Sequence, residues 1–98
     1  MARILRVAAA QSGPIQKEES REAVVVRLLE LMKEASANDC DLVVFTELAL
    51  TTFFPRYFEK DQAQMDGWFE SEMPNSAVQP LFDCAIKHRI GFTLGYAE

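Results

Sequence analysis

The sequence predicts an α/β fold whose strands and helices alternate in the order β-α-β-α-β. Two short apolar runs, residues 4–10 and 42–45, have the composition of strands. Between them, residues 18–37 repeat their apolar side chains with the 3.6-residue period of a helix. A second helical stretch and a third apolar run follow in the same order. The short connections predict parallel pairing with right-handed crossovers.

The first predicted strand, residues 4–10, becomes small and apolar toward its end, and a turn follows at residues 11–14. A nucleotide-binding turn at this place would need several glycines, so that phosphates reach the N-terminus of the next helix. Gly13 is the only glycine in the turn. The turn therefore does not favour a nucleotide site.

Residues 18–37 are predicted to form a surface helix packed on a sheet. At 100° per residue, one broad face gathers apolar side chains: Val24, Val25, Leu28, Leu29, Leu31, Met32 and Ala35. Charged side chains fall on the opposite face: Arg27, Glu30, Lys33 and Glu34. Glu18, Glu19 and Glu22 near the start suit the positive end of the helix dipole, and Asn38-Asp39 predicts the stop.

The run Leu42–Phe45 is continuous, apolar and rich in β-branched and aromatic residues, which is typical of a strand covered on both faces. Glu47 follows directly after it. In parallel α/β sheets, ligands bind at the carboxyl ends of the strands, so Glu47 is a candidate site residue. A helix cap or a salt-bridged loop residue is the structural alternative, and position by itself leaves both open.

The loop at residues 48–58 carries four aromatic residues around a proline. Aromatics beside a carboxylate line a substrate pocket or bury the loop, and packing is favoured for any single one of them. Residues 60–73 are acidic and irregular, with a short helix predicted through Met65, Trp68 and Phe69.

Ser76 is the predicted N-cap of a second long helix that runs to His88. Pro80 at the fifth position implies a distorted first turn or a later start. His88 is interpreted as a structural residue near the C-terminal end of the helix dipole. Gly91 is predicted to end the helix, and residues 92–96 to form the third strand.

The 98 residues make one small domain at most, and because half of them are apolar, a packed core is expected. A net charge of −5 without any basic stripe argues against nucleic acid or an anionic membrane as partner. No signal peptide or membrane span is indicated, so the cytoplasm is the expected location. Cys40 and Cys84 lack metal-ligand spacing and His88 is the single histidine, so neither a metal nor a cofactor is expected.

Residues 43–56, Val-Val-Phe-Thr-Glu-Leu-Ala-Leu-Thr-Thr-Phe-Phe-Pro-Arg, resemble the strand and loop that carry the catalytic glutamate of the nitrilase superfamily of carbon-nitrogen hydrolases. The resemblance is closest to the N-carbamoyl-D-amino acid amidohydrolases. Residues 6–14, 24–31 and 80–98 fit the same pattern, so the whole chain is covered. Thr46 stands where the family usually has proline, which is expected to loosen the aim of the carboxylate without removing it.

The resemblance implies that residues 1–98 are the N-terminal part of a single carbon-nitrogen hydrolase domain, roughly the first third of a nitrilase-type αββα sandwich and therefore incomplete. It also implies a small-molecule substrate, an N-carbamoyl-D-amino acid that is cleaved to the D-amino acid, ammonia and carbon dioxide. In the family mechanism Glu47 would be the general base, a lysine would stabilise the oxyanion and a cysteine would attack the carbon. The lysine and the cysteine are expected outside this chain.

Neither cysteine of the chain is expected to replace that nucleophile. Cys40 precedes the strand that Glu47 follows, and an extended segment of this length separates them by on the order of 20 Å. Cys84 shares the apolar helix face with Leu81 and Ala85, which predicts a buried, inert thiol.

Two other functional readings remain open. One is another amidase branch of the nitrilase superfamily, and the other is a stand-alone, non-catalytic α/β module that binds a small molecule or a partner. Three strands that are apolar on both faces cannot be covered by two helices. A homo-oligomer is therefore expected.

Overall fold

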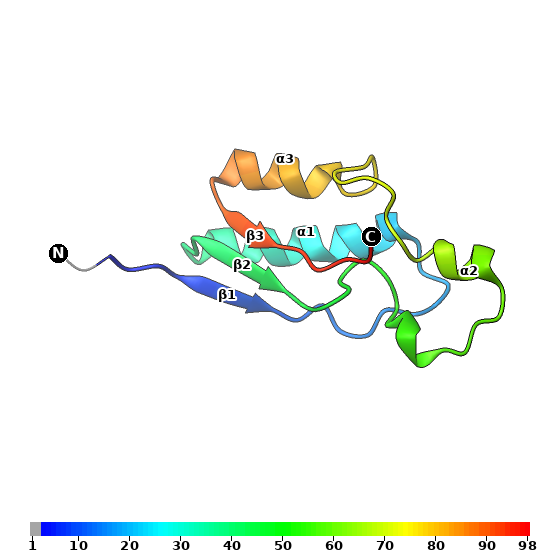
Figure 1. The fold of residues 1–98 in the computed structure, drawn as a ribbon. Helices are drawn as coiled ribbons and strands as arrows, with labels where there is room; N and C mark the ends of the chain where they lie inside the picture. The colour runs from blue at the N-terminus through cyan, green and yellow to red at the C-terminus, as the bar shows by residue number, and fades with distance from the viewer. Residues whose placement is uncertain (1–2) are drawn as a thin grey trace.

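The computed structural model describes residues 3–98 and contains one three-stranded sheet, three α-helices and a 3₁₀ turn. In chain order the elements are β1 (Val7–Ala10), α1 (Arg21–Ala37), β2 (Leu42–Phe45), η1 (Phe54–Arg56), α2 (Gln62–Asp66), α3 (Gln79–His88) and β3 (Gly91–Thr93). The sheet has the order β1-β2-β3, and both pairings are parallel (Figure 1). The predicted α/β class and parallel pairing are confirmed. Among residues 3–98, no helix has the length and apolar character needed to cross a membrane.

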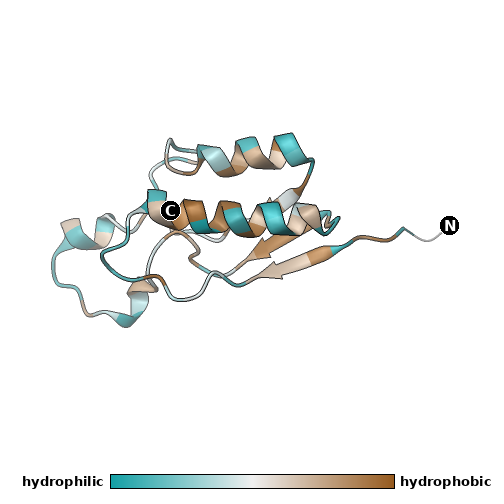
Figure 2. Cartoon of the chain, turned by 180° about the vertical axis from the view of Figure 1, so that it is seen from behind, coloured by the Kyte–Doolittle hydropathy of each residue, from teal (hydrophilic) through white to brown (hydrophobic). Residues whose placement is uncertain are grey.

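Both long helices lie on the same side of the sheet. In Figure 1 the strands lie in front of α1, and in Figure 2, seen from behind, α1 and α3 lie in front of the strands. This arrangement follows from consecutive parallel strands whose crossovers share one hand. The other side of the sheet carries no helix from the described residues, so the sheet has a covered face and an open face.

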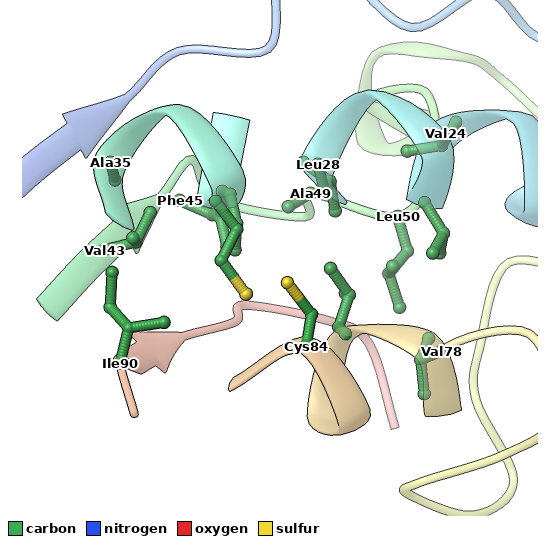
Figure 3. Close-up of a cluster of buried hydrophobic side chains, with 13 residues drawn as sticks. Val24, Leu28, Ala35, Val43, Phe45, Ala49, Leu50, Val78, Cys84 and Ile90 are labelled. Atoms are coloured by element: carbon green, nitrogen blue, oxygen red, sulfur yellow. The ribbon is translucent and has the colours of Figure 1, made fainter. Parts of the chain in front are cut away.

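The hydrophobic core fills the space between α1, α3 and the covered face of the sheet (Figure 3). It consists of side chains that are almost fully buried: Val24, Val25, Leu28, Met32, Ala35, Val43, Phe45, Ala49, Leu50, Val78, Leu81, Cys84 and Ile90. Burying one aliphatic side chain of this size contributes about 1.5–3 kcal/mol. The apolar face predicted for the first helix is therefore the face that packs.

The prediction that β2 is covered on both faces is wrong for this chain. Val43 is fully buried against the helices, whereas Val44 points the other way and is 38 % exposed. The register places Ala9 of β1 beside Val44, and Ala9 is exposed as well. Successive strand residues alternate between faces, and only one face has helices.

The first strand is shorter than the predicted 4–10 because its partner begins at Leu42. Val7 pairs with Leu42, and Asp41 closes the ladder, its Oδ2 accepting the Arg6 amide at 2.9 Å and its own amide donating to the Arg6 carbonyl. Ile4 and Leu5 therefore have no strand to pair with and are exposed.

The first helix starts later than the predicted residue 18, at Arg21. Ser20 is its N-cap, and the Ser20 hydroxyl accepts the Ala23 amide at 3.1 Å. Of the three glutamates expected near the dipole, only Glu22 lies in the first turn. Glu19 instead accepts the Gln16 amide before the helix begins. The predicted stop is confirmed, with Asn38 at the C-cap.

Ser76 is not an N-cap. The Asn75 side chain accepts the amides of Ala77 and Val78, and α3 begins only at Gln79, with Pro80 in its first turn. Proline fits there because its missing N–H has no helical partner in the first turn. The later start that Pro80 implied is the one observed.

Gly91 does not end the second helix. Arg89 does so in a left-handed conformation with φ 53°, and Gly91 is already the first residue of β3. The third strand ends at Thr93 rather than at residue 96. The short helix predicted through Met65, Trp68 and Phe69 is α2, which contains Met65 and ends at Asp66, before the other two.

Candidate functional site

Glu47 lies two residues beyond the end of β2, in a tight turn at the carboxyl edge of the sheet. Leu48 adopts a left-handed conformation with φ 46°, which turns the chain back toward the core. Ala49 and Leu50 are then buried, at 0 % and 2 % exposure. The Ala49 amide donates to the Gly95 carbonyl at 3.0 Å. The turn is therefore held on its C-terminal side by burial and by a backbone hydrogen bond.

Gly95 braces the same turn by close packing. A Cβ atom at Gly95 would lie 3.5 Å from the Leu48 nitrogen and 3.6 Å from the Glu47 Cα. The segment that follows β3 thus runs directly against the backbone that carries the carboxylate. This contact explains why β3 stops early, because the chain beyond Thr93 leaves the ladder to pass the turn.

A hollow of about 130 Å³ opens beside the carboxylate. Its lining comes from the loop after β1, the turn after β2 and the loop that follows: Gly13, Pro14, Ile15, Thr46, Glu47, Leu48, Thr51 and Phe53. The loops at the carboxyl ends of two neighbouring parallel strands therefore meet around Glu47. This is the place at which parallel α/β sheets bind ligands.

The Glu47 side chain is exposed and unengaged. Within residues 3–98, no hydrogen bond or ion pair reaches its carboxylate, and no helix begins near enough for it to serve as a cap. The structural alternative, a cap or a salt-bridged loop residue, therefore has no support in the described part of the chain. A carboxylate in this state is available to take a proton from a ligand.

The other candidate residues do not join Glu47. Cys84 is buried in the core at 7 % exposure, as predicted (Figure 3). Cys40 lies before β2 and Glu47 after it, so the strand separates them. His88 is exposed in the last turn of α3. The described residues form no group of three or more histidine, cysteine or acidic side chains arranged to hold a metal ion.

Some aromatic side chains of the loop at residues 48–58, the aromatic loop, are buried and others are exposed. Phe54 is buried, stacks on Trp68 with ring centroids 6.3 Å apart, and meets Phe69 at 5.5 Å. Phe53 is 49 % exposed and lines the hollow. Phe58 is 87 % exposed and packs on little. The predicted preference for packing is thus confirmed for Phe54, whereas Phe53 faces the site.

Lys17 and Arg56 form a small basic surface around Tyr57. Lys17 Nζ and Arg56 Cζ each lie 4.9 Å from the centre of the Tyr57 ring, and Arg56 Nη2 donates to the Tyr57 hydroxyl at 2.8 Å. This hydrogen bond lowers the pKa of Tyr57, because it stabilises the phenolate. The two cations follow closely on Ile15 and Phe53, which line the hollow.

Sequence reasoning missed one buried polar cluster. Glu70 is 5 % exposed and pairs with Arg21, while Asn75 donates to its other oxygen. Arg21 and Glu70 are 49 residues apart in the chain. No local pattern joins them.

Comparison with known protein families agrees with this geometry. The profile of the carbon-nitrogen hydrolases matches residues 6–98, which include the whole sheet, both long helices and the turn that carries Glu47. The match confirms the resemblance to the nitrilase superfamily. The chain belongs to the carbon-nitrogen hydrolase family.

Proposed function

We propose that this chain supplies the general base of a carbon-nitrogen hydrolase that cleaves the carbamoyl C–N bond of N-carbamoyl-D-amino acids. The observation that carries the proposal is the Glu47 carboxylate, which lies exposed and unengaged beside a hollow at the carboxyl edge of the sheet. The substrate class rests on the likeness of residues 43–56 to the glutamate segment of the N-carbamoyl-D-amino acid amidohydrolases. The family itself rests on the match over residues 6–98.

In the proposed reaction, Glu47 accepts the proton of a cysteine thiol as the sulfur attacks the carbamoyl carbon. A lysine ammonium stabilises the negative oxygen that forms. The C–N bond to the terminal amino group breaks, and that group takes the proton from Glu47 and leaves as ammonia. Glu47 then takes a proton from the water that attacks the thioester carbon, and it returns this proton to the departing cysteine sulfur. The product carbamate loses carbon dioxide and releases the amino acid.

Two cations on the loops that line the hollow favour a substrate with a carboxylate. Lys17 and Arg56 stand on the loops that line it, and neither forms an ion pair with an acidic side chain in residues 3–98. Most of the chain has the opposite sign, with a net charge of −5. A local positive surface attracts an amino-acid carboxylate more than a neutral amide. Replacing either cation is thus expected to raise KM more than it lowers kcat.

The 98-residue chain without further segments is expected to be inactive. General-base assistance contributes only about 10²–10⁴ by itself. Cys84 is buried and Cys40 is separated from Glu47 by β2, so the described residues bring no thiol to the carboxylate. Ammonia release by the purified 98-residue chain that disappears in Glu47→Gln would contradict this proposal.

The decisive test is Glu47→Gln in the protein that joins this chain to the lysine and the cysteine. Glutamine keeps the size and one acceptor but cannot take a proton, so kcat should fall at least about 10²-fold with folding intact. Glu47→Asp should also fail, because a displacement of 1 Å can cost about 10²-fold. Glu72→Gln, at another exposed glutamate, is the matched control and should keep full turnover. Near wild-type kcat in Glu47→Gln would overturn the proposal.

A substrate panel separates the proposed activity from the other amidase branches of the family. The panel holds N-carbamoyl-D- and N-carbamoyl-L-amino acids, an aliphatic amide and an aryl amide. Higher kcat/KM for the N-carbamoyl-D-amino acids supports the assignment. Preference for a neutral amide would place the chain in another branch and would leave the role of Glu47 intact.

A further inference from the structure

We propose that Glu70 is a positioning residue for Glu47. Its buried ion pair with Arg21 anchors the segment after β3, which in turn braces the turn that carries Glu47. We call the side chains of Arg21, Glu70 and Asn75 the latch. The catalytic consequence rests on the proposed function of Glu47, whereas the structural consequence does not.

The latch is built around the buried charge. Glu70 Oε2 accepts from Arg21 Nε at 2.7 Å, and Oε1 accepts from Asn75 Nδ2 at 3.0 Å. Arg21 Nη2 donates to the Gly67 carbonyl at 2.6 Å. A carboxylate is costly to bury unless both of its oxygens have partners. Here both do, so Glu70 is held in one position by two side chains from different parts of the chain.

The backbone of Glu70 connects the latch to the segment after β3. The Glu70 amide donates to the Ala97 carbonyl at 2.7 Å. Two residues earlier, the Gly95 carbonyl accepts the Ala49 amide, and a Cβ atom at Gly95 would lie only 3.6 Å from the Glu47 Cα. Residues 95–97 are therefore tied to the latch at one end and to the Glu47 turn at the other.

A second path runs through the aromatic loop. Phe69, the neighbour of Glu70, packs on Phe54 at 5.5 Å. Phe54 directly follows Phe53, which lines the hollow beside Glu47. Loss of the latch would loosen residues 95–97, which pack against the Glu47 turn, and Phe53, which lines the hollow. Both effects change where the carboxylate points.

The chain contains a matched control in its other ion pair. Arg27 Nη2 lies 3.1 Å from Glu19 Oε2, and the two side chains are 34 % and 32 % exposed. Exposed pairs of this kind contribute little to stability, and this one touches neither residues 95–97 nor the aromatic loop. Arg27 also donates to the carbonyl of Pro14, which lines the hollow, so the control variant is Glu19→Gln, which leaves Arg27 in place. Glu19→Gln should therefore leave the Glu47 turn unchanged.

The test compares Arg21→Met, Glu70→Gln, their double variant and Glu19→Gln in the full-length protein. Four quantities are measured: the hydrogen-exchange rate of the Ala49 amide, kcat, KM and the melting temperature. In Glu70→Gln we expect faster exchange at Ala49 and a kcat about 10-fold or more below wild type, with KM changed less than kcat. Arg21→Lys keeps the charge but lacks the planar guanidinium that donates to two groups at once. It should raise the Ala49 exchange rate and lower kcat, each by less than Glu70→Gln does.

The double variant separates positioning from stability. It leaves no unpaired buried charge, so the melting temperature should recover toward wild type. If Glu70 positions Glu47, kcat stays low and the Ala49 amide still exchanges faster than in the wild type, although the melting temperature recovers. Recovery of kcat together with the melting temperature would show a purely structural role, and wild-type exchange at Ala49 in Glu70→Gln would also overturn the proposal. Full activity of Glu47→Gln would instead refute the proposed function, and the exchange rates would still test the latch.

Discussion

The helix–sheet layer and the loop region, residues 46–78, are held together in different ways. In the layer, formed by the three strands with α1 and α3, the buried side chains are all apolar. The loop region contains all three of the buried polar residues of the described chain: Thr51, Thr52 and Glu70. Apolar packing tolerates small changes of shape, whereas a buried polar group needs particular partners.

This difference separates stability from position. The layer supplies most of the buried apolar area, which makes it the main source of folding free energy. The loop region sets where Glu47 and its surroundings lie, through backbone hydrogen bonds and one buried ion pair. Substitutions in the layer should therefore change stability first, and substitutions in the loop region should change the geometry of the site.

The largest expected effect is on the layer. Leu28→Ala removes a side chain with 0 % exposure and should lower the free energy of unfolding by about 2–5 kcal/mol. Phe58→Ala, at 87 % exposure in the loop region, should change it by no more than about 0.5 kcal/mol. Urea denaturation of both variants measures the contrast. Equal losses would mean that the loop region contributes to the core as much as the layer does.

A second prediction concerns the open face of the layer. Exposed Val7, Ala9 and Val44, next to the unpaired edge of β1, should lead the chain to associate with a second copy at tens of micromolar. Val44→Lys places a charge at the centre of this face and should weaken association about 10-fold or more. Sedimentation velocity measures both. A wild-type chain that stays monomeric at that concentration would contradict the prediction.

The helix caps allow a smaller and sharper comparison. Ser20 caps α1 through its hydroxyl, so Ser20→Ala should cost about 0.5–2 kcal/mol of stability. Ser76 lies in the loop region and does not cap α3, because Asn75 accepts the amides there. Ser76→Ala should therefore leave the unfolding midpoint almost unchanged. A cost at Ser76 equal to that at Ser20 would contradict the finding that Ser76 is not a cap.

The smallest effect is spectroscopic and concerns the two tyrosines of the chain. The Arg56 hydrogen bond lowers the pKa of Tyr57, whereas partial desolvation, with a hydrogen bond to Glu98, raises the pKa of Tyr96. Alkaline titration followed by absorbance should therefore show two separate steps. Arg56→Ala should move the earlier step to higher pH and leave the later step in place. A single shared step in the wild type would remove the predicted difference.

The sign of the linked stability also differs between the two tyrosines. Folding favours the phenolate of Tyr57, so stability gained from it appears as the pH rises through its lowered pKa. Folding disfavours the phenolate of Tyr96, so its ionisation removes stability as the pH rises past the ordinary tyrosine range.

The sequence predicted the elements best where one local pattern decides them. β2 has its predicted bounds, because a continuous apolar run between polar residues permits little else. The end of α1 at Asn38 was also predicted. The start of α1 was not, because several nearby residues compete to accept the free amides. For α3, Pro80 implied the later start, but the cap predicted at Ser76 was wrong, because the Asn75 side chain accepts the amides of Ala77 and Val78.

The site was predicted in part for the same reason. Its place at the carboxyl end of β2 follows from strand order, and the structure puts Glu47 there. The role of Glu47 as general base stays a prediction. The brace at Gly95 and the pairing of Arg21 with Glu70 could not be predicted, since each joins residues almost fifty positions apart through contacts that only the folded chain creates.

The strand register has a consequence for how the chain acquires its working shape during synthesis. Val7 pairs with Leu42, 35 positions away, and Leu42 with Gly91, 49 positions away. The difference in loop-closure entropy between these two pairings is only about 0.3 kcal/mol, so chain length does not decide between them. The order in which the strands emerge from the ribosome decides which pairing forms first, and β1 can pair with β2 before β3 has emerged. Glu47 therefore leaves the ribosome well before Gly95 and Ala97, and its turn has no brace until they follow.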